Sequence, residues 1–373
     1  IPFCKQKCYY CDFVSYAKNE KFFERYIGAL LEEMNNFFDN NDVEIKTIYI
    51  GGGTPSIIDA KYIEEIMNFF KKRDLLKKTK EITIEVNPGT VDEEKIKCYK
   101  KAGINRLSIG LQSTDDNMLK KIGRIHCYKD FLNTYKFAKE AGFDNINVDI
   151  MIGLPEQKIF NVKNTLEEII NLEPEPPKHI SVYSLIVEEN TPIEKMINDG
   201  TLELPDEENE RNMYWYVKNF LELNGYNHYE ISNFSKDGYE SIHNSDCWKQ
   251  KEYIGFGVAA HSFIDDVRFG NTSNLDEYLR NCENKDFENN RIIDEVEKDL
   301  FSKEQEFMLV GLRMIDGVSI QEFKNKFGGN PIFIFKSELS KLVEDGLLMV
   351  DFDRIKLTNR GLDLANLVWE EFV

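Results

Sequence analysis

Three cysteines stand close together near the start of the chain, where Cys4, Cys8 and Cys11 form a C-x3-C-x2-C pattern. Seven cysteines in all is an odd number, and thiols this closely spaced favour a metal centre over disulfides. Three thiolates leave a tetrahedral zinc site one ligand short unless a distant residue supplies a fourth. They suit a [4Fe-4S] cluster with one iron left open. The pattern predicts such a cluster, with a zinc site or merely packed cysteines as the alternatives.

A run of glycines follows the β-branched segment Thr47–Ile50, in the order Gly51, Gly52, Gly53, Thr54 and Pro55. Glycines let a backbone approach a ligand closely, and their N–H groups can bind carboxylate or carbonyl oxygens. The run is not a P-loop, because no Gly-Lys-Ser/Thr follows. It predicts a ligand-binding loop, and the alternative is a tight turn before a helix.

Four polar residues accompany the apolar segments that follow. Glu85, Gln112 and Asp149 lie in or at the ends of strand-like runs, and Arg124 comes just after a short helical segment. In a βα barrel the carboxyl ends of the strands converge on the active site. Carboxylates there can accept from hydroxyl or ammonium groups, and an arginine can hold a carboxylate. The alternative is ordinary polar residues or buried ion pairs.

The cysteine stretch IPFCKQKCYYCDF resembles the cluster motif of radical S-adenosylmethionine enzymes, with Tyr10 as the aromatic residue before the third cysteine. The resemblance continues in order through YIGGGTPS, TIEVNPG, RLSIGLQS, IGRIH, NVDIMIGLP, HYEISNF and HNSDCW. It covers nearly the whole chain. The chain is most similar to the coproporphyrinogen III dehydrogenase-like branch, and within it to the HemW-type haem chaperones.

The resemblance implies that an open iron of the cluster chelates S-adenosylmethionine, and that one-electron reduction cleaves a sulfur–carbon bond to give a 5′-deoxyadenosyl radical. Such chemistry belongs to the cofactors, while the fold positions them. The residues implied as S-adenosylmethionine contacts are Tyr10, Gly52, Gly53, Thr54, Glu85, Gln112, Arg124 and Asp149.

Haem is the second ligand that the resemblance implies. HemW-type proteins have an H-N-x-x-Y-W stretch connected with haem binding, and this chain has His243 to Trp248 with Cys247 in place of the tyrosine. Histidine and cysteine both ligate haem iron, so the change affects the mode of binding more than its possibility. The alternative is that His243 anchors a loop by hydrogen bonds. His261, among small residues, is a weaker candidate and is expected to be packed.

Three functions are compatible with these motifs. The favoured one is a haem chaperone, with haem as cargo, haem-accepting proteins and an electron donor as partners. The second is an oxygen-independent coproporphyrinogen III dehydrogenase, whose pattern has another cysteine two residues after the third. Phe13 occupies that position here, which favours the chaperone. The third is a radical methyltransferase on the same scaffold.

Strand-like and helix-like segments alternate through the first half of the chain and predict parallel βα units. The fold class is therefore α/β, a partial (β/α)6 radical S-adenosylmethionine barrel, because six strands are too few for a closed barrel. The strand segments are Ile1–Phe3, Thr47–Ile50, Ile82–Val86, Arg106–Leu111, Asn147–Ile152 and His179–Leu185.

We expect three regions: the barrel over residues 1–225, an aromatic and glycine-rich connection over 226–300, and a winged-helix-like α+β domain over 301–373. The formal net charge of −19 makes nucleic acid an improbable partner. No apolar run approaches the roughly 20 residues that span a bilayer, so we expect at most peripheral membrane contact. The odd number of cysteines on a long chain makes a secreted disulfide scaffold improbable, so we expect a cytoplasmic protein with reduced cysteines.

Overall fold

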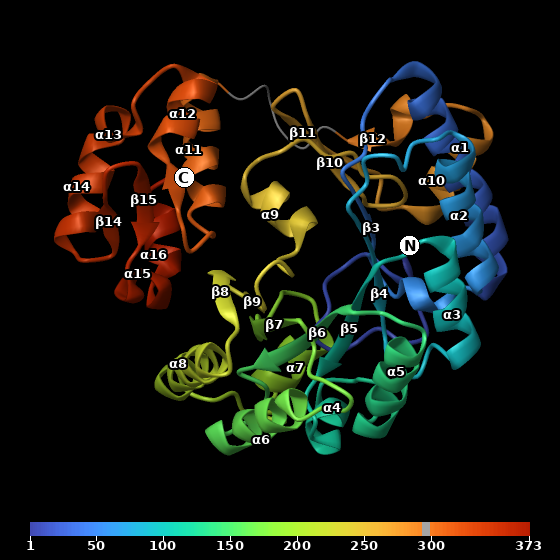
Figure 1. The fold of residues 1–373 in the computed structure, drawn as a ribbon, viewed down its shortest axis with the longest axis horizontal. Coiled ribbons are helices and arrows are strands. Elements are labelled where there is room, and N and C mark those ends of the chain that lie inside the picture. The colour runs from blue at the N-terminus through green and yellow to red at the C-terminus, as the bar shows by residue number, and fades with distance from the viewer. Residues whose placement is uncertain (293–298) are drawn as a thin grey trace.

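The computed structural model describes residues 1–292 and 299–373, and its main feature is one curved sheet of seven strands (Figure 1). The strand order is β3-β4-β5-β6-β7-β9-β8; β3 to β7 are parallel, whereas β9 and β8 are antiparallel to their neighbours. This curved, half-barrel α/β architecture confirms the expected fold class. The strands are β3 (Thr47–Ile50), β4 (Glu81–Val86), β5 (Arg106–Gln112), β6 (Asn145–Ile152), β7 (His179–Ser184), β8 (Asn227–Glu230) and β9 (Asn233–Ser235).

Helices cover the outer face of this sheet (Figure 1). Successive side chains of a strand point to opposite faces, so the outer face of the sheet can be apolar while its inner face is polar. In β4, Ile82, Ile84 and Val86 join the main apolar core, whereas the residues between them are polar. The concave side is therefore lined by polar groups. The helices are α1 (Phe23–Asn40), α2 (Ala60–Lys72), α3 (Glu93–Ala102), α4 (Asp116–Lys121), α5 (Tyr128–Glu140), α6 (Ile159–Ile170), α7 (Pro192–Asn198) and α8 (Glu207–Leu223), with short 3-10 turns at Glu20–Phe22 and Pro55–Ile57.

Five of the six expected strand segments lie in the main sheet, and the first does not. Strand β1 (Phe3–Cys4) pairs in parallel with β2 (Tyr16–Ala17). The same stretch also accepts hydrogen bonds from the glycine run, Gly53 N to Ile1 O at 3.0 Å and Thr54 N to Phe3 O at 2.8 Å. The cysteine motif thus starts alongside the carboxyl end of β3.

The C-terminal region has an apolar core of its own, formed by residues between Phe307 and Phe372. Its hairpin joins β14 to β15 as expected, and Ser319 Oγ caps α12 by accepting from Glu322 N at 3.2 Å. The elements are α11 (Leu300–Gly311), β13 (Val318–Ser319), α12 (Ile320–Phe327), α13 (Pro331–Ile334), α14 (Lys336–Glu344), β14 (Leu348–Val350), β15 (Arg354–Leu357), α15 (Asn359–Asp363) and α16 (Ala365–Glu370).

The segment between barrel and C-terminal region contributes to both. Strands β8 and β9 extend the main sheet, and Leu275 and Tyr278 join the core that contains α1. Its remaining elements are α9 (Ile242–Trp248), β10 (His261–Ile264), β11 (Val267–Asn271), α10 (Leu275–Glu283), the 3-10 turn Glu288–Asn290 and β12 (Arg291–Ile292). The region boundaries expected at residues 225 and 300 stay predictions. Residues 293–298, just before the second boundary, lie outside the described residues. Within the described ranges, no helix has the length and apolar character to cross a bilayer.

Candidate functional site

The three cysteines of the motif lie in a loop that is tied to the barrel on both sides. Cys4 is buried, and Cys8 and Cys11 are half-buried. Tyr9 N donates to Ile122 O at 3.0 Å, and Ile193 N donates to Tyr9 O at 3.0 Å. These backbone bonds hold the loop against the end of α4 and the first turn of α7.

Hydrogen-bond donors are directed at two of the three sulfurs. Thr54 Oγ1 donates to Cys4 Sγ at 3.4 Å, and Arg124 Nη1 lies 3.6 Å from Cys8 Sγ. Donors of this kind stabilise thiolates. In the described part of the chain, no three His, Cys, Asp or Glu side chains form a group that could hold a metal ion. The three thiols are free, and their chemistry fits the ligand set of an iron–sulfur cluster.

The glycine run passes so close to the cysteine loop that a side chain would collide. A Cβ on Gly53 would lie 2.9 Å from Phe3 O and 3.0 Å from Cys4 Sγ. Gly52 has a φ of +120°, which L side chains rarely adopt, and its N–H donates to Glu85 Oε2 at 3.2 Å. The run therefore connects the cysteine loop to the carboxylate of Glu85.

Glu85 is a half-buried carboxylate with two donors. Tyr49 Oη donates to Oε1 at 2.9 Å, and Gly52 N to Oε2. Burial raises the pKa of Glu85 to about 7, and the nearby charge of Asp149 adds to the rise, while the two hydrogen bonds oppose it. Its charge therefore changes near neutral pH.

Arg124 lies near the carboxyl ends of strands β4 and β5. Its Nη2 donates to Gly110 O at 2.6 Å and to Asn87 Oδ1 at 3.0 Å, and its charge opposes the rise that burial causes in the pKa of Tyr10. Gln112 ends β5 with a φ of +72°, at an irregularity in the pairing of β5 with β6. Such backbone strain in a non-glycine residue is typical of ligand sites.

Asp149 is the partner of Gly110 in the register of β5 and β6. It accepts from Asn147 Nδ2 at 2.7 Å and from Ser108 Oγ at 3.3 Å. Burial raises the pKa of Asp149, against these hydrogen bonds and the charge of Arg106. The structure thus brings the cysteines, the glycine run and the four polar strand-end residues to one end of the barrel.

His243 lies at the other end. Its Nδ1 is 2.9 Å from Oγ1 of Thr47, the first residue of β3, and its ring stacks on Tyr49 with centroids 5.1 Å apart. Its Nε2 is 3.9 Å from Sγ of Cys247. The carboxylate of Glu81, the first residue of β4, accepts from the backbone N–H groups of Ile242 and His243 at 2.9 and 3.1 Å. Helix α9 is thereby fixed to the amino ends of the strands.

Comparison with known proteins places this geometry in a family. The model of the radical SAM superfamily matches residues 1–169, and that of the HemN C-terminal domain matches residues 305–364. A protein of Lactococcus lactis named "Heme chaperone HemW" is 35% identical, covering 100% of this chain and 96% of the relative. A Bacillus subtilis protein of the same name is 37% identical, covering 100% and 97%. The chain belongs to the HemW family of radical SAM proteins.

A solved structure shares the fold of this HemW family member. Coproporphyrinogen III oxidase (HemN) from Escherichia coli, described as a radical SAM enzyme, superimposes with a TM-score of 0.83 over 100% of this chain and 88% of that chain. The sequence identity is 21%, so the likeness concerns the fold alone.

Two residues of the HemW family member's site, Asn87 and Glu81, were not predicted from the sequence. Asn87 accepts from Arg124, and Glu81 holds α9, yet Glu81 lies 162 positions from His243. Asn87 directly follows a strand and could have been included on that ground. Conversely, His261 was expected to be packed and is exposed at the start of β10, because its side chain lies on the outside of the β10–β11 hairpin.

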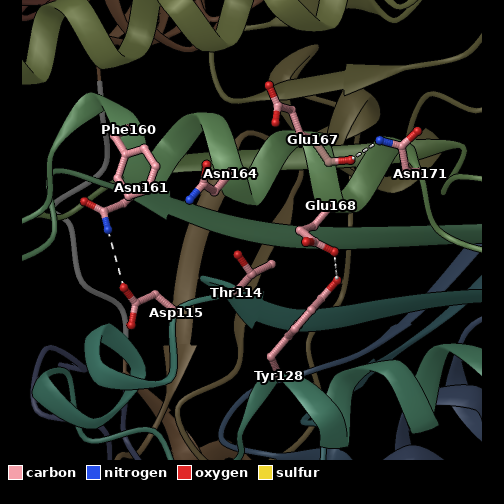
Figure 2. Close-up of a pocket in the computed structure, with 9 residues that line it drawn as sticks. All are labelled: Thr114, Asp115, Tyr128, Phe160, Asn161, Asn164, Glu167, Glu168 and Asn171. Atoms are coloured by element: carbon pink, nitrogen blue, oxygen red, sulfur yellow. Dashed lines mark hydrogen bonds between the residues drawn. The ribbon is translucent and has the colours of Figure 1, made fainter.

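A pocket of about 530 Å³ lies elsewhere, on the outer side of the barrel between α5, α6 and the segment before α4 (Figure 2). In it, Tyr128 Oη donates to Glu168 and Asn161 Nδ2 donates to Asp115. None of the site residues predicted from the sequence lines this pocket. Its lining consists of Thr114, Asp115, Tyr128, Phe160, Asn161, Asn164, Glu167, Glu168 and Asn171.

Proposed function

We propose that this HemW family member carries a [4Fe-4S] cluster on Cys4, Cys8 and Cys11, binds S-adenosylmethionine beside it, and binds haem for delivery to haem-dependent proteins. The name of its relatives, "Heme chaperone HemW", supports the cargo and its delivery. The family membership and the donors directed at Cys4 and Cys8 support the cluster.

The cysteine end of the barrel is the end that holds Cys4, Cys8 and Cys11. The polar groups at this end have roles suited to their chemistry. A bound cluster supplies one-electron reduction of S-adenosylmethionine. Thr54 and Arg124 stabilise the thiolates by donating to their sulfurs. Glu85 and Asp149 offer carboxylate oxygens to the hydroxyl or ammonium groups of the ligand, and Arg124 keeps a free Nε donor that none of the described residues accepts. Gly52 and Gly53, which lack side chains, let the glycine run pass directly beside the segment that carries Cys4.

The observation that carries the proposal is the match over the whole chain to relatives named "Heme chaperone HemW". His243 contacts Thr47, the first residue of β3, whereas Cys4 lies beside Thr54, beyond the last residue of that strand. Strand β4 has six residues from Glu81 to Val86, which span about 16 Å at roughly 3.3 Å per residue. The cysteines and His243 therefore lie apart along the barrel, and Tyr49 lies between their two sites, since its ring stacks on His243 and its hydroxyl donates to Glu85.

The test is anaerobic reconstitution of the cluster followed by two parallel assays. We expect the wild type to bind haem stoichiometrically, to transfer it to an apo haem protein, and to leave coproporphyrinogen III unconverted. His243→Ala should weaken haem binding or change the Soret band while leaving the cluster absorbance intact. Cys98→Ala, outside the motif, is the matched control. Conversion of coproporphyrinogen III without a stable haem complex would establish a dehydrogenase instead.

Partners follow from this function. Haem-accepting proteins receive the cargo, and an electron donor reduces the cluster. We place the protein in the cytoplasm, with at most peripheral contact to a membrane.

A further inference from the structure

Arg106 is buried inside the barrel with a hydrogen-bond donor unused. It is the first residue of β5, its side chain is 2% exposed, and its Nε has no partner among the described residues. A buried guanidinium is costly to keep without a counter-charge or an acceptor. An unused donor on such a group therefore indicates a missing acceptor.

A second unused donor lies on the neighbouring strand. Thr83 of β4 is the register partner of Arg106, its side chain is fully buried, and its Oγ1 also lacks a partner among the described residues. Paired residues of parallel strands point to the same face, so both donors face the barrel interior. Asn145, the register partner of Arg106 on β6, adds an acceptor, Oδ1, to which no described residue donates.

The carboxylates that share the interior are bonded to other donors. Glu81 accepts from the backbone of α9, Glu85 from Tyr49 and Gly52, and Asp149 from Asn147 and Ser108. Water could satisfy the hydrogen bonds of Thr83 and Asn145, but it would not neutralise the charge of Arg106. A ligand carboxylate would do both, because guanidinium and carboxylate match in geometry and charge.

We propose that Arg106 and Thr83 bind a carboxylate of the ligand that His243 helps to hold. This rests on the proposed function and identifies the carboxylate as a haem propionate. Tyr49, Thr83 and Arg106 form one row across β3, β4 and β5, and the His243 ring stacks on Tyr49 at the end of that row. Two strand spacings of about 4.8 Å each separate β3 from β5. Their sum is comparable with the distance from the iron of a haem to the edge of the porphyrin.

S-adenosylmethionine also has a carboxylate, but the geometry favours the propionate. Gln112, at the opposite end of β5, lies six residues from Arg106, about 20 Å along the strand. The cysteine loop lies at that far end. Glu85 pairs with Ser108, two residues along β5 from Arg106, so the separate affinities of the variants for S-adenosylmethionine and for haem decide between the two carboxylates.

The experiment compares haem with its dimethyl ester, which lacks both carboxylates, on the reconstituted full chain. We expect the wild type to bind haem at least about tenfold more tightly than the diester, which is the loss expected for one charge-assisted contact. Arg106→Gln should abolish that preference, Arg106→Lys should keep part of it, and the affinity for S-adenosylmethionine should stay unchanged in both. Thr83→Val, which keeps the side-chain shape, should reduce the preference and serves if Arg106→Gln fails to fold.

Each contrary result has a separate meaning. A wild type that binds haem and diester equally overturns the carboxylate site while leaving the proposed function in place. An Arg106→Gln variant that weakens both porphyrins equally also overturns it, since Arg106 is then only structural. Loss of S-adenosylmethionine affinity in place of haem affinity assigns the carboxylate to that ligand. A wild type that binds neither porphyrin refutes the proposed function itself.

Discussion

Glu85 is a residue whose protonation links the candidate site to pH. Its pKa is raised to about 7, chiefly by burial, from an ordinary value of 4.5. Because the folded state binds this proton more tightly than the unfolded state, stability falls as pH rises from about 4.5 through 7. We expect the ligand-free protein to lose up to about 3 kcal/mol of unfolding free energy over that interval from this group. Urea denaturation of wild type and Glu85→Gln at pH 5 and pH 8 measures it.

The Glu85→Gln variant should lack this part of the pH dependence and be the more stable protein at pH 8. Glu44→Gln, a change at an exposed carboxylate, is the control and should follow the wild type. Equal pH slopes for wild type and Glu85→Gln would show that Glu85 titrates normally in the folded protein.

The three motif cysteines make a second prediction at the scale of residues. Replacing Cys4, Cys8 or Cys11 with Ala should abolish the visible absorbance and the bound iron after anaerobic reconstitution, since each thiolate would bind a different iron. Cys282→Ala, at a buried cysteine that lies in the α10 core, should keep the cluster. Iron and sulfide analysis measures the result. Four irons bound to a triple Ala variant would refute the ligand assignment.

Helix α9 shows how an element depends on one distant side chain. Glu81 accepts from Ile242 N and His243 N, and Lys46 Nζ pairs with Asp246 Oδ2 at 2.6 Å. Glu81→Gln keeps the shape but removes the negative charge that faces the two N–H groups. We expect faster hydrogen exchange in α9 and haem affinity lowered by about tenfold, corresponding to a loss of about 1.5 kcal/mol or more for hydrogen bonds to a charged group.

Cluster content and S-adenosylmethionine affinity should stay unchanged in Glu81→Gln, because its side chain lies at the amino end of β4. Glu93→Gln, at an exposed carboxylate on α3, is the matched control. If haem affinity stays at the wild-type level while α9 exchanges faster, α9 does not hold the haem.

Strand periodicity explains what the sequence could predict at this scale. Runs such as Ile82–Val86 and Arg106–Leu111 alternate polar and apolar residues, and they lie in the sheet where expected. The strand-end residues of the candidate site followed from the same reasoning. Strands β8 and β9 were not among the six predicted strand segments, because three or four residues are too few to show the alternation that marks a strand. The contacts of Glu81, Thr83 and Arg106 depend on which strands are neighbours, which residue spacing does not encode.

At the scale of the whole molecule, hydrogen bonds and ring contacts join the barrel sheet and α9 to the C-terminal region. Ile231 N donates to Arg313 O, and Ile315 N donates to Tyr229 O, both at 3.1 Å. The Arg313 guanidinium lies over the rings of Trp248 and Trp369, 4.4 and 5.3 Å from their centroids. Since Trp248 is the last residue of α9, the helix that carries His243 is held by the barrel at one end and by the C-terminal region at the other (Figure 1).

Arg313→Ala should therefore affect haem as well as stability. Two cation–π contacts in a half-buried setting are each worth about 0.5–2 kcal/mol, so we expect a loss of about 1–4 kcal/mol of unfolding free energy. Haem should dissociate several-fold faster, because α9 loses the contact that fixes its last residue. Stopped-flow transfer of haem to apomyoglobin measures this rate, and urea denaturation measures the stability. Arg360→Ala, at an exposed arginine of α15 in the same region, should change neither. A lower stability with an unchanged haem dissociation rate would mean that the C-terminal region stabilises the fold without acting on the helix that holds His243.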